Sequence, residues 1–133
     1  MKYICLGYYD KDAFKAMTES QRDRMFDSCF EYDDGLRAKG HWVGGEALQG
    51  PETAMTLSSR NGTVIKTDGP YAETKEQIGG ILVLEAKDME HAAQLIGQHP
   101  ALAFGNIFEI RPVGDMSGIM QASRQRRSPA HTS

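Results

Sequence analysis

The chain has little cysteine, a single tryptophan and no long apolar run. Only two of its 133 residues are cysteine, and no CxxC spacing occurs. Two cysteines are too few for a small disulfide-stapled scaffold. No stretch approaches the roughly 20 consecutive apolar residues that a membrane-spanning helix needs. We therefore expect neither a disulfide scaffold nor a membrane protein.

A secretory signal is also missing from the start of the chain. Residues 1–9 run directly into strand-like sequence, without the apolar core and the small-residue cleavage site of a signal peptide. We therefore expect a cytoplasmic protein. Cys5 and Cys29 both fall inside expected regular elements, so we interpret them as reduced core residues.

An excess of basic residues is absent as well. The chain has 15 Lys and Arg against 18 Asp and Glu, a net charge of −3, which argues against nucleic acid as a partner. The charge is uneven, because three arginines and one aspartate after residue 113 give +2 there and leave −5 for residues 1–113. We expect one domain over 1–113 and a basic, disordered tail over 114–133.

What the sequence does contain is a regular succession of strand and helix signals. Thr18 and Gln21 form a capping-box pattern at the start of a helix that should end at Gly40. Asn61 and Gly62 are a strong signal for a hairpin. The expected elements are strands at 2–9, 41–48, 78–86 and 107–113, helices at 18–40 and 88–99, and a hairpin over 53–67.

This order, β-α-β, hairpin, β-α-β, predicts a ferredoxin-like α+β fold with an antiparallel sheet. The first strand and the strand at 78–86 are apolar on both faces, yet two helices can cover only one face of such a sheet. An exposed apolar face of that size is rare in monomers. We therefore predict a homodimer that packs through the free sheet face. The alternative is that the hairpin or the tail folds back over that face.

The segment at 67–80, TDGPYAETKEQIGG, resembles the signature of the YCII-related family, in the branch named for an Asp-Gly-Pro-Phe motif. Tyr71 stands where that branch usually has Phe. The segments at 36–40 and 108–113 also resemble the family, so that the likeness covers residues 1–113. The resemblance implies a dimeric α/β barrel.

The resemblance implies little about the reaction. Most members of the family are uncharacterised, a few act on chlorinated or ring-cleavage intermediates, and some occur with extracytoplasmic-function sigma factors. In some relatives a His–Asp pair lines a cleft. The first long helix of this chain has no histidine, and His99 stands before Pro100 where relatives have aspartate. The pair therefore does not transfer residue by residue.

The motif loop contains the main candidate site residues. Asp68 is a candidate catalytic base, because a carboxylate at a strand end can accept a proton in a cleft, although Asp also commonly binds the backbone N–H groups of a turn. Lys75 is a candidate for holding an anionic substrate, with a surface ion pair as the alternative. Tyr71 is a candidate ligand contact or a loop anchor.

The other candidates for contacting a small-molecule ligand are Glu73, His41, Trp42 and His99. For His41 and Trp42 the alternative is ordinary packing after a helix end, and for His99 it is an interaction with terminal helix carbonyls. No metal-ligand spacing, Walker motif or GxGxxG occurs, so we expect no metal and no cofactor.

These observations lead to a hypothesis with two alternatives. The first is a cofactor-independent proton-transfer enzyme, of isomerase or lyase type, acting on a small anionic or carbonyl compound. The second is a non-catalytic ligand-binding or regulatory module linked to sigma-factor regulation of transcription. The third is a cofactor-free oxygenase. Whether the protein is catalytic at all is left open by the sequence.

Overall fold

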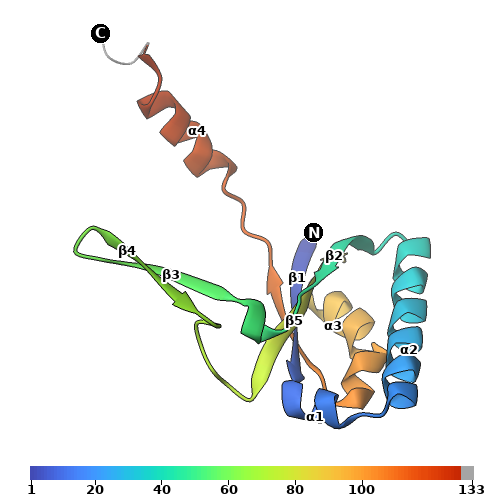
Figure 1. Ribbon diagram of the computed structural model, residues 1–133. Coiled ribbons are helices and arrows are strands. Elements are labelled where there is room, and N and C mark those ends of the chain that lie inside the picture. Colours follow the sequence, from blue (N-terminus) through green and yellow to red (C-terminus); the bar gives the residue numbers. More distant parts are fainter. Residues whose placement is uncertain (130–133) are drawn as a thin grey trace.

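The computed structural model describes residues 1–129. A four-stranded antiparallel sheet forms its centre, three helices pack on it, and a two-stranded hairpin and a fourth helix project from it (Figure 1). The strands are β1 (Lys2–Asp10), β2 (Trp42–Ala47), β3 (Met55–Arg60), β4 (Thr63–Asp68), β5 (Glu76–Glu85) and β6 (Ile107–Pro112). The helices are α1 (Lys11–Ala16), α2 (Glu19–Ala38), α3 (Met89–Gly97) and α4 (Ser117–Arg126), with short 3₁₀ turns at Pro51–Thr53 and Pro100–Phe104.

The strand order of the main sheet confirms the predicted fold class. The order is β2-β5-β1-β6, and every neighbouring pair is antiparallel. The hairpin β3–β4 is inserted between β2 and β5 and forms a separate sheet. Without this insertion, the remaining elements make the βαββαβ order and the strand arrangement of a ferredoxin-like α+β fold.

Local sequence signals set the limits of α2 and of the hairpin. The Thr18 side chain accepts a hydrogen bond from the backbone of Gln21, and the Gln21 side chain accepts one from the backbone of Thr18, as predicted. At the other end Gly40 has a φ of +79°, which favours glycine. Asn61 and Gly62 have φ of 51° and 79°, as the tight turn of a hairpin requires.

The core lies between the sheet and helices α2 and α3. Tyr3 and Cys5 of β1 point into it, and Leu84 of β5 is completely buried. From the helix side, α2 contributes Leu36 and α3 contributes Ile96. Helices α2 and α3 lie on this one face of the sheet (Figure 1), as the predicted element order requires.

The opposite face of the sheet is apolar and carries no helix. In the register of the strands, Ile4 lies beside Val83 and Leu6 beside Ile81, alternating with the core residues. The hairpin and α4 extend away from the sheet on this side instead of folding back over it (Figure 1). Within residues 1–129 the apolar face therefore stays uncovered.

The tail contains more structure than its composition predicted. We expected residues 114–133 to be disordered, and α4 occupies part of that range. The carboxylate of Asp115 accepts a hydrogen bond of 2.9 Å from the backbone N–H of Ser117, at the start of the helix. Residues 130–133 lie outside the described part of the chain. Among residues 1–129, none of the helices has the length and apolar character to cross a membrane.

Candidate active site

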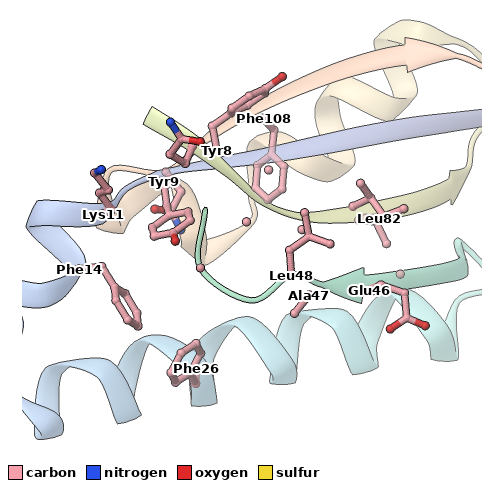
Figure 2. A pocket seen from close by; sticks show the side chains of 18 of the residues that line it. Tyr8, Tyr9, Lys11, Phe14, Phe26, Glu46, Ala47, Leu48, Leu82 and Phe108 are labelled. Carbon is pink, nitrogen blue, oxygen red and sulfur yellow. The ribbon is translucent and has the colours of Figure 1, made fainter. Parts of the chain in front are cut away.

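A cavity of about 1170 Å³ lies between α2 and the sheet, close to β2 (Figure 2). This volume slightly exceeds the range usual for small-molecule sites, roughly 300–1,000 Å³. Residues from β1, β2, β5, β6, α1 and α2 contribute to its walls, together with the loops at the base of the hairpin. Many of the side chains that line it are aromatic, among them Phe14, Phe26, Phe30, Trp42 and Phe108.

One stripe of α2 faces this cavity. Phe26, Phe30, Asp33 and Arg37 are spaced i, i+4, i+7 and i+11, so they lie on the same side of the helix, and all four line the cavity. The stripe is adjacent to the core stripe that contains Met25 and Leu36. Phe26 and Phe30 are stacked with ring centres 5.9 Å apart, and they stay 40% and 60% exposed. The helix therefore presents two aromatic rings, then a carboxylate, then a guanidinium.

The carboxylate of Asp33 and the imidazole of His99 form a pair in the cavity wall. Oδ1 of Asp33 lies 2.9 Å from Nε2 of His99, and the two side chains are 17% and 6% exposed. The two residues are 66 positions apart in the sequence. His99 precedes the 3₁₀ turn at Pro100–Phe104, and this turn packs against α2, which brings the imidazole to Asp33.

The second nitrogen of His99 fixes the tautomer. The backbone N–H of Ala101 donates a hydrogen bond of 3.1 Å to Nδ1, so Nδ1 is the unprotonated nitrogen and the hydrogen is on Nε2. His99 therefore donates Nε2–H to Asp33 and has no free lone pair for a substrate proton. Among residues 1–129 no hydrogen bond reaches Oδ2 of Asp33. In this pair the aspartate is the group that can accept a proton.

Aromatic rings enclose the pair. His99 makes edge contacts with Tyr32 and Phe108, at ring-centre distances of 5.1 and 5.2 Å. The hydroxyl of Tyr32 donates to the carbonyl of Leu95. Burial raises the pKa of Tyr32, and the negative charge of Asp33 raises it further. The position of the imidazole ring is therefore set by packing as well as by hydrogen bonds.

Two contacts orient the side chain of Arg37, which is 51% exposed. Its guanidinium lies over the ring of Trp42, 4.3 Å from the ring centre, and Nη1 donates to Oδ1 of Asp34 at 2.7 Å. Gly45 makes room for Trp42, because a Cβ at this position would lie 2.8 Å from the indole ring. The cation thus has an aromatic support on one side and a carboxylate on another.

Comparison with known proteins places the chain in a family. The model of the YCII-related domain matches residues 1–117. The chain belongs to the YCII-related family. An uncharacterised protein, R00369 of Rhizobium meliloti (strain 1021), is 28% identical over 118 residues, which cover 85% of this chain and 92% of that protein. Among solved structures, 5-chloro-2-hydroxyhydroquinone dehydrochlorinase (TftG) from Burkholderia phenoliruptrix AC1100, in complex with 2,5-dihydroxybenzoquinone, has a TM-score of 0.49 at 14% identity and covers 86% of this chain and 94% of its own.

The His–Asp pair of this YCII-related protein has its residue types exchanged relative to the expected pattern. The resemblance implied a histidine on the first long helix and an aspartate before the proline that follows the second. Here Asp33 is on the first long helix, and His99 precedes Pro100. A His–Asp pair is nevertheless present, formed by Asp33 of the first long helix and His99 before Pro100.

Three of the predicted site residues line the cavity, namely Trp42, Glu73 and His99. His41 is outside the set of lining residues. Its Nδ1–H donates to the carbonyl of Glu85 at 3.0 Å, and its ring contacts that of His91. This geometry corresponds to the packing alternative.

The remaining three predicted residues, Asp68, Tyr71 and Lys75, are exposed and are not among the cavity-lining residues. Asp68 is the last residue of β4, and Tyr71 is 93% exposed. Lys75 forms an ion pair with Asp10, with Nζ 3.4 Å from Oδ2. The structure therefore does not bring these three side chains together with Asp33 and His99, and their roles in binding or catalysis stay predictions.

The motif loop is held by the buried side chain of Gln77. Its amide donates to the carbonyl of Ala72 at 3.0 Å and to that of Thr74 at 2.9 Å. Gly79 of β5 allows this strand to approach Tyr9, because a Cβ at Gly79 would lie 2.7 Å from the ring of Tyr9. Part of the family motif thus shapes the loop and the adjoining wall of the cavity.

Asp33 is the residue that sequence reasoning missed. A signal was available, because the stripe of Phe26, Phe30, Asp33 and Arg37 has helical spacing and is too aromatic for a purely solvated face. Within residues 1–129, no group of three or more His, Cys, Asp or Glu side chains is arranged to hold a metal ion.

Proposed function

We propose that this YCII-related protein is a cofactor-independent enzyme that transfers a proton on a small molecule, with Asp33 as the base and His99 as the group that positions it. The observation that carries the proposal is the 2.9 Å pair in the cavity wall, in which the backbone of Ala101 occupies the other imidazole nitrogen. A carboxylate held in this way and partly shielded from water suits general base catalysis.

The proposed step begins with a substrate that has an acidic C–H next to a carbonyl group. Oδ2 of Asp33 takes the proton, the C–H electron pair forms a C=C bond, and the carbonyl π electrons move to oxygen to give an enolate. Return of the proton from Asp33 to another carbon of the conjugated system gives an isomer. In an elimination, the enolate instead re-forms the carbonyl, its C=C electrons expel the leaving group with its electron pair, and the proton on Asp33 passes to solvent. His99 keeps Nε2–H on Oδ1 throughout.

Asp68 remains the rival base, and the two assignments are tested together. The assay is incorporation of solvent deuterium into a panel of planar carbonyl acids, followed by proton NMR. We expect Asp33→Asn to slow exchange about 100-fold or more and Asp68→Asn to leave most of it. Asp27→Asn, an exposed carboxylate on the same helix, is the matched control.

His99→Gln provides a second measurement on the positioning role. The amide can donate a hydrogen bond to Asp33 but lacks the packed ring, so we expect a partial loss of turnover without a change in overall fold, checked by circular dichroism. Loss of exchange in Asp68→Asn with retention in Asp33→Asn would assign the base to the motif loop. Ligand binding with no exchange in the wild-type protein would favour the non-catalytic alternative.

We further propose that the protein is a homodimer, in which a second copy covers the apolar sheet face. The hairpin and α4 project on the side of this face (Figure 1). Leu57 and Val64 of the hairpin are 61% and 63% exposed, and Ile119 of α4 is 61% exposed. A two-stranded hairpin alone is only marginally stable in water. An apolar partner surface would stabilise both projecting elements.

The occupant that fits best is another copy of this chain. When the same apolar face of two copies packs together about a two-fold axis, each copy covers the exposed face of the other. The charges are complementary too, because the tail after residue 113 carries +2 and the remainder −5. In the proposed dimer, the hairpin and α4 of one copy pack against the acidic body of the other.

A cytoplasmic location is part of the same proposal. Cys5 and Cys29 are free thiols, as the sequence predicted. Burial raises the pKa of Cys5 to about 11, and it also raises the pKa of Cys29. Neither residue is expected to react readily at neutral pH, which is consistent with structural thiols in a reducing compartment.

A further inference from the structure

We propose that Arg37 is the anion-binding group of the cavity, and that the ligand is a planar, conjugated compound with a negatively charged oxygen. The inference extends the proposed function by naming the substrate class. Ligand binding can nevertheless be measured without turnover, so the proposed binding role of Arg37 and the proposed catalytic function can fail separately.

The first argument is that the guanidinium is already in place. Trp42 supports one face of it, and Asp34 accepts a hydrogen bond from Nη1. Arginine has five N–H donors in a fixed planar array, and among residues 1–129 the only hydrogen-bond acceptor found for Arg37 is Asp34. Donors therefore remain for a ligand oxygen, and the contact with Trp42 already restricts part of the side-chain freedom that binding would otherwise remove.

The second argument is the spacing along α2. Asp33 and Arg37 are four residues apart, so their Cβ atoms lie roughly 5–6 Å from each other on one helix face. A single small molecule can present an acidic C–H to the first and the oxygen that gains negative charge to the second. One turn before Asp33, Phe30 provides a flat apolar surface for the rest of the molecule.

The third argument compares Arg37 with the other cations of the cavity. Lys11 and Lys15 also line it, but no ion pair within residues 1–129 fixes either ammonium group. Several carboxylates share the wall, including Asp34, Glu46 and Glu73. Because these carboxylates repel an anion, an anionic ligand needs a directed hydrogen-bonding contact. The planar N–H donors of a guanidinium match the two oxygens of a carboxylate better than an ammonium group does.

The test uses two ligands that differ in charge but hardly in shape, 2-naphthoate and 2-naphthamide. Their dissociation constants are measured by ligand-observed NMR titration of the full chain. We expect the wild-type protein to bind the carboxylate about tenfold more tightly than the amide, as a charge-assisted hydrogen bond would allow. Arg37→Gln should remove most of this preference, mainly by weakening binding of the carboxylate.

Two further variants complete the design. Lys66→Gln, on the exposed hairpin, controls for the loss of one positive charge and should leave the preference intact. The double variant Lys11→Gln, Lys15→Gln should weaken binding of the carboxylate twofold at most. An unchanged preference in Arg37→Gln, its loss in the double lysine variant, or its absence in the wild-type protein would each overturn the assignment. Preference for the carboxylate without deuterium exchange would support this inference and count against the proposed catalysis.

Discussion

At the scale of single residues, the backbone of Ala101 decides what His99 can do. A free Nδ1 would make the imidazole the natural base and Asp33 its orienting partner. With the Ala101 N–H on Nδ1, the roles reverse, and the carboxylate is the proton acceptor. The same two side chains would thus support a different assignment if one backbone N–H pointed elsewhere.

Gln77 supports a prediction about the family motif. Replacement of Gln77 by Ala removes two partly buried hydrogen bonds to the loop carbonyls and leaves those carbonyls to find new partners. We expect the free energy of unfolding to fall by about 1–3 kcal/mol. Urea unfolding followed by circular dichroism measures the loss, and hydrogen exchange locates it.

In that experiment faster exchange should be confined to the loop at 70–76 and the start of β5. Thr53→Ala, which removes one exposed hydroxyl bond to the carbonyl of Gly50, serves as a comparison in the neighbouring turn. An unaltered stability in Gln77→Ala would mean that the motif loop does not depend on this amide.

The sequence predicted the site only in part, and the residues show why. Trp42 and His99 were predicted as site residues because tryptophan and histidine are residue types that commonly contact ligands. Asp33 was missed because its neighbour is Asp34, and two adjacent acids on a helix usually indicate a solvated face. Its partner is 66 residues away, a contact that no local pattern reveals. Asp68 and Lys75 stood out because they belong to the motif, whereas the structure places both side chains in solvent.

At the scale of elements, local signals predicted most of the fold. The capping box, the Asn-Gly turn and the apolar strand at 78–86 each act over a few residues, so the sequence alone was sufficient for them. Helix α1 was not among the expected elements, and α4 was expected to be disordered. Both are helices without a fully buried residue, and such helices lack the strong apolar periodicity on which prediction depends.

The start of α1 carries a prediction about pH. Asp10 caps this helix by accepting hydrogen bonds from Asp12 and Ala13, and it pairs with Lys75 of the motif loop. The bond from Ala13, the bond from Asp12 and the lysine charge lower the pKa of Asp10. Because the folded-state pKa is lower than the unfolded one, the stabilisation is complete well above about pH 4 and is lost as the pH falls through the folded-state value.

Asp10→Asn should remove this dependence, since an amide can still cap the helix but carries no charge. The difference in unfolding free energy between wild type and variant, measured in urea from pH 6 to pH 2.5, should shrink as the pH decreases. Lys75→Gln should show a smaller effect of the same sign. A difference that stayed constant over this range would argue that the charge of Asp10 makes no contribution.

At the scale of the whole molecule, the uncovered sheet face leads to a prediction of subunit number. Sedimentation equilibrium at micromolar concentration should give twice the mass of one chain. Val83→Asp places a charge in the middle of the apolar face and should shift the mass toward one chain. The temperature of unfolding of the wild-type protein should rise with protein concentration, as expected when association and folding are linked.

Ala93→Glu, on the exposed side of α3, is the matched control and should remain a dimer. Removal of residues 114–133 tests the contribution of α4, and a dimer that persists without them would rest on the sheet face and the hairpin alone. A wild-type protein with the mass of one chain at millimolar concentration would contradict the proposed assembly.

The stacking of Trp42 against Arg37 has a practical consequence. Trp42 is the only tryptophan of the chain, and its indole ring lies in the cavity wall. Its emission spectrum therefore reports on a single place, where an arriving ligand must displace water or disturb the guanidinium. A compound library can be screened for the natural substrate by intrinsic fluorescence, with no label attached and without knowing the reaction beforehand.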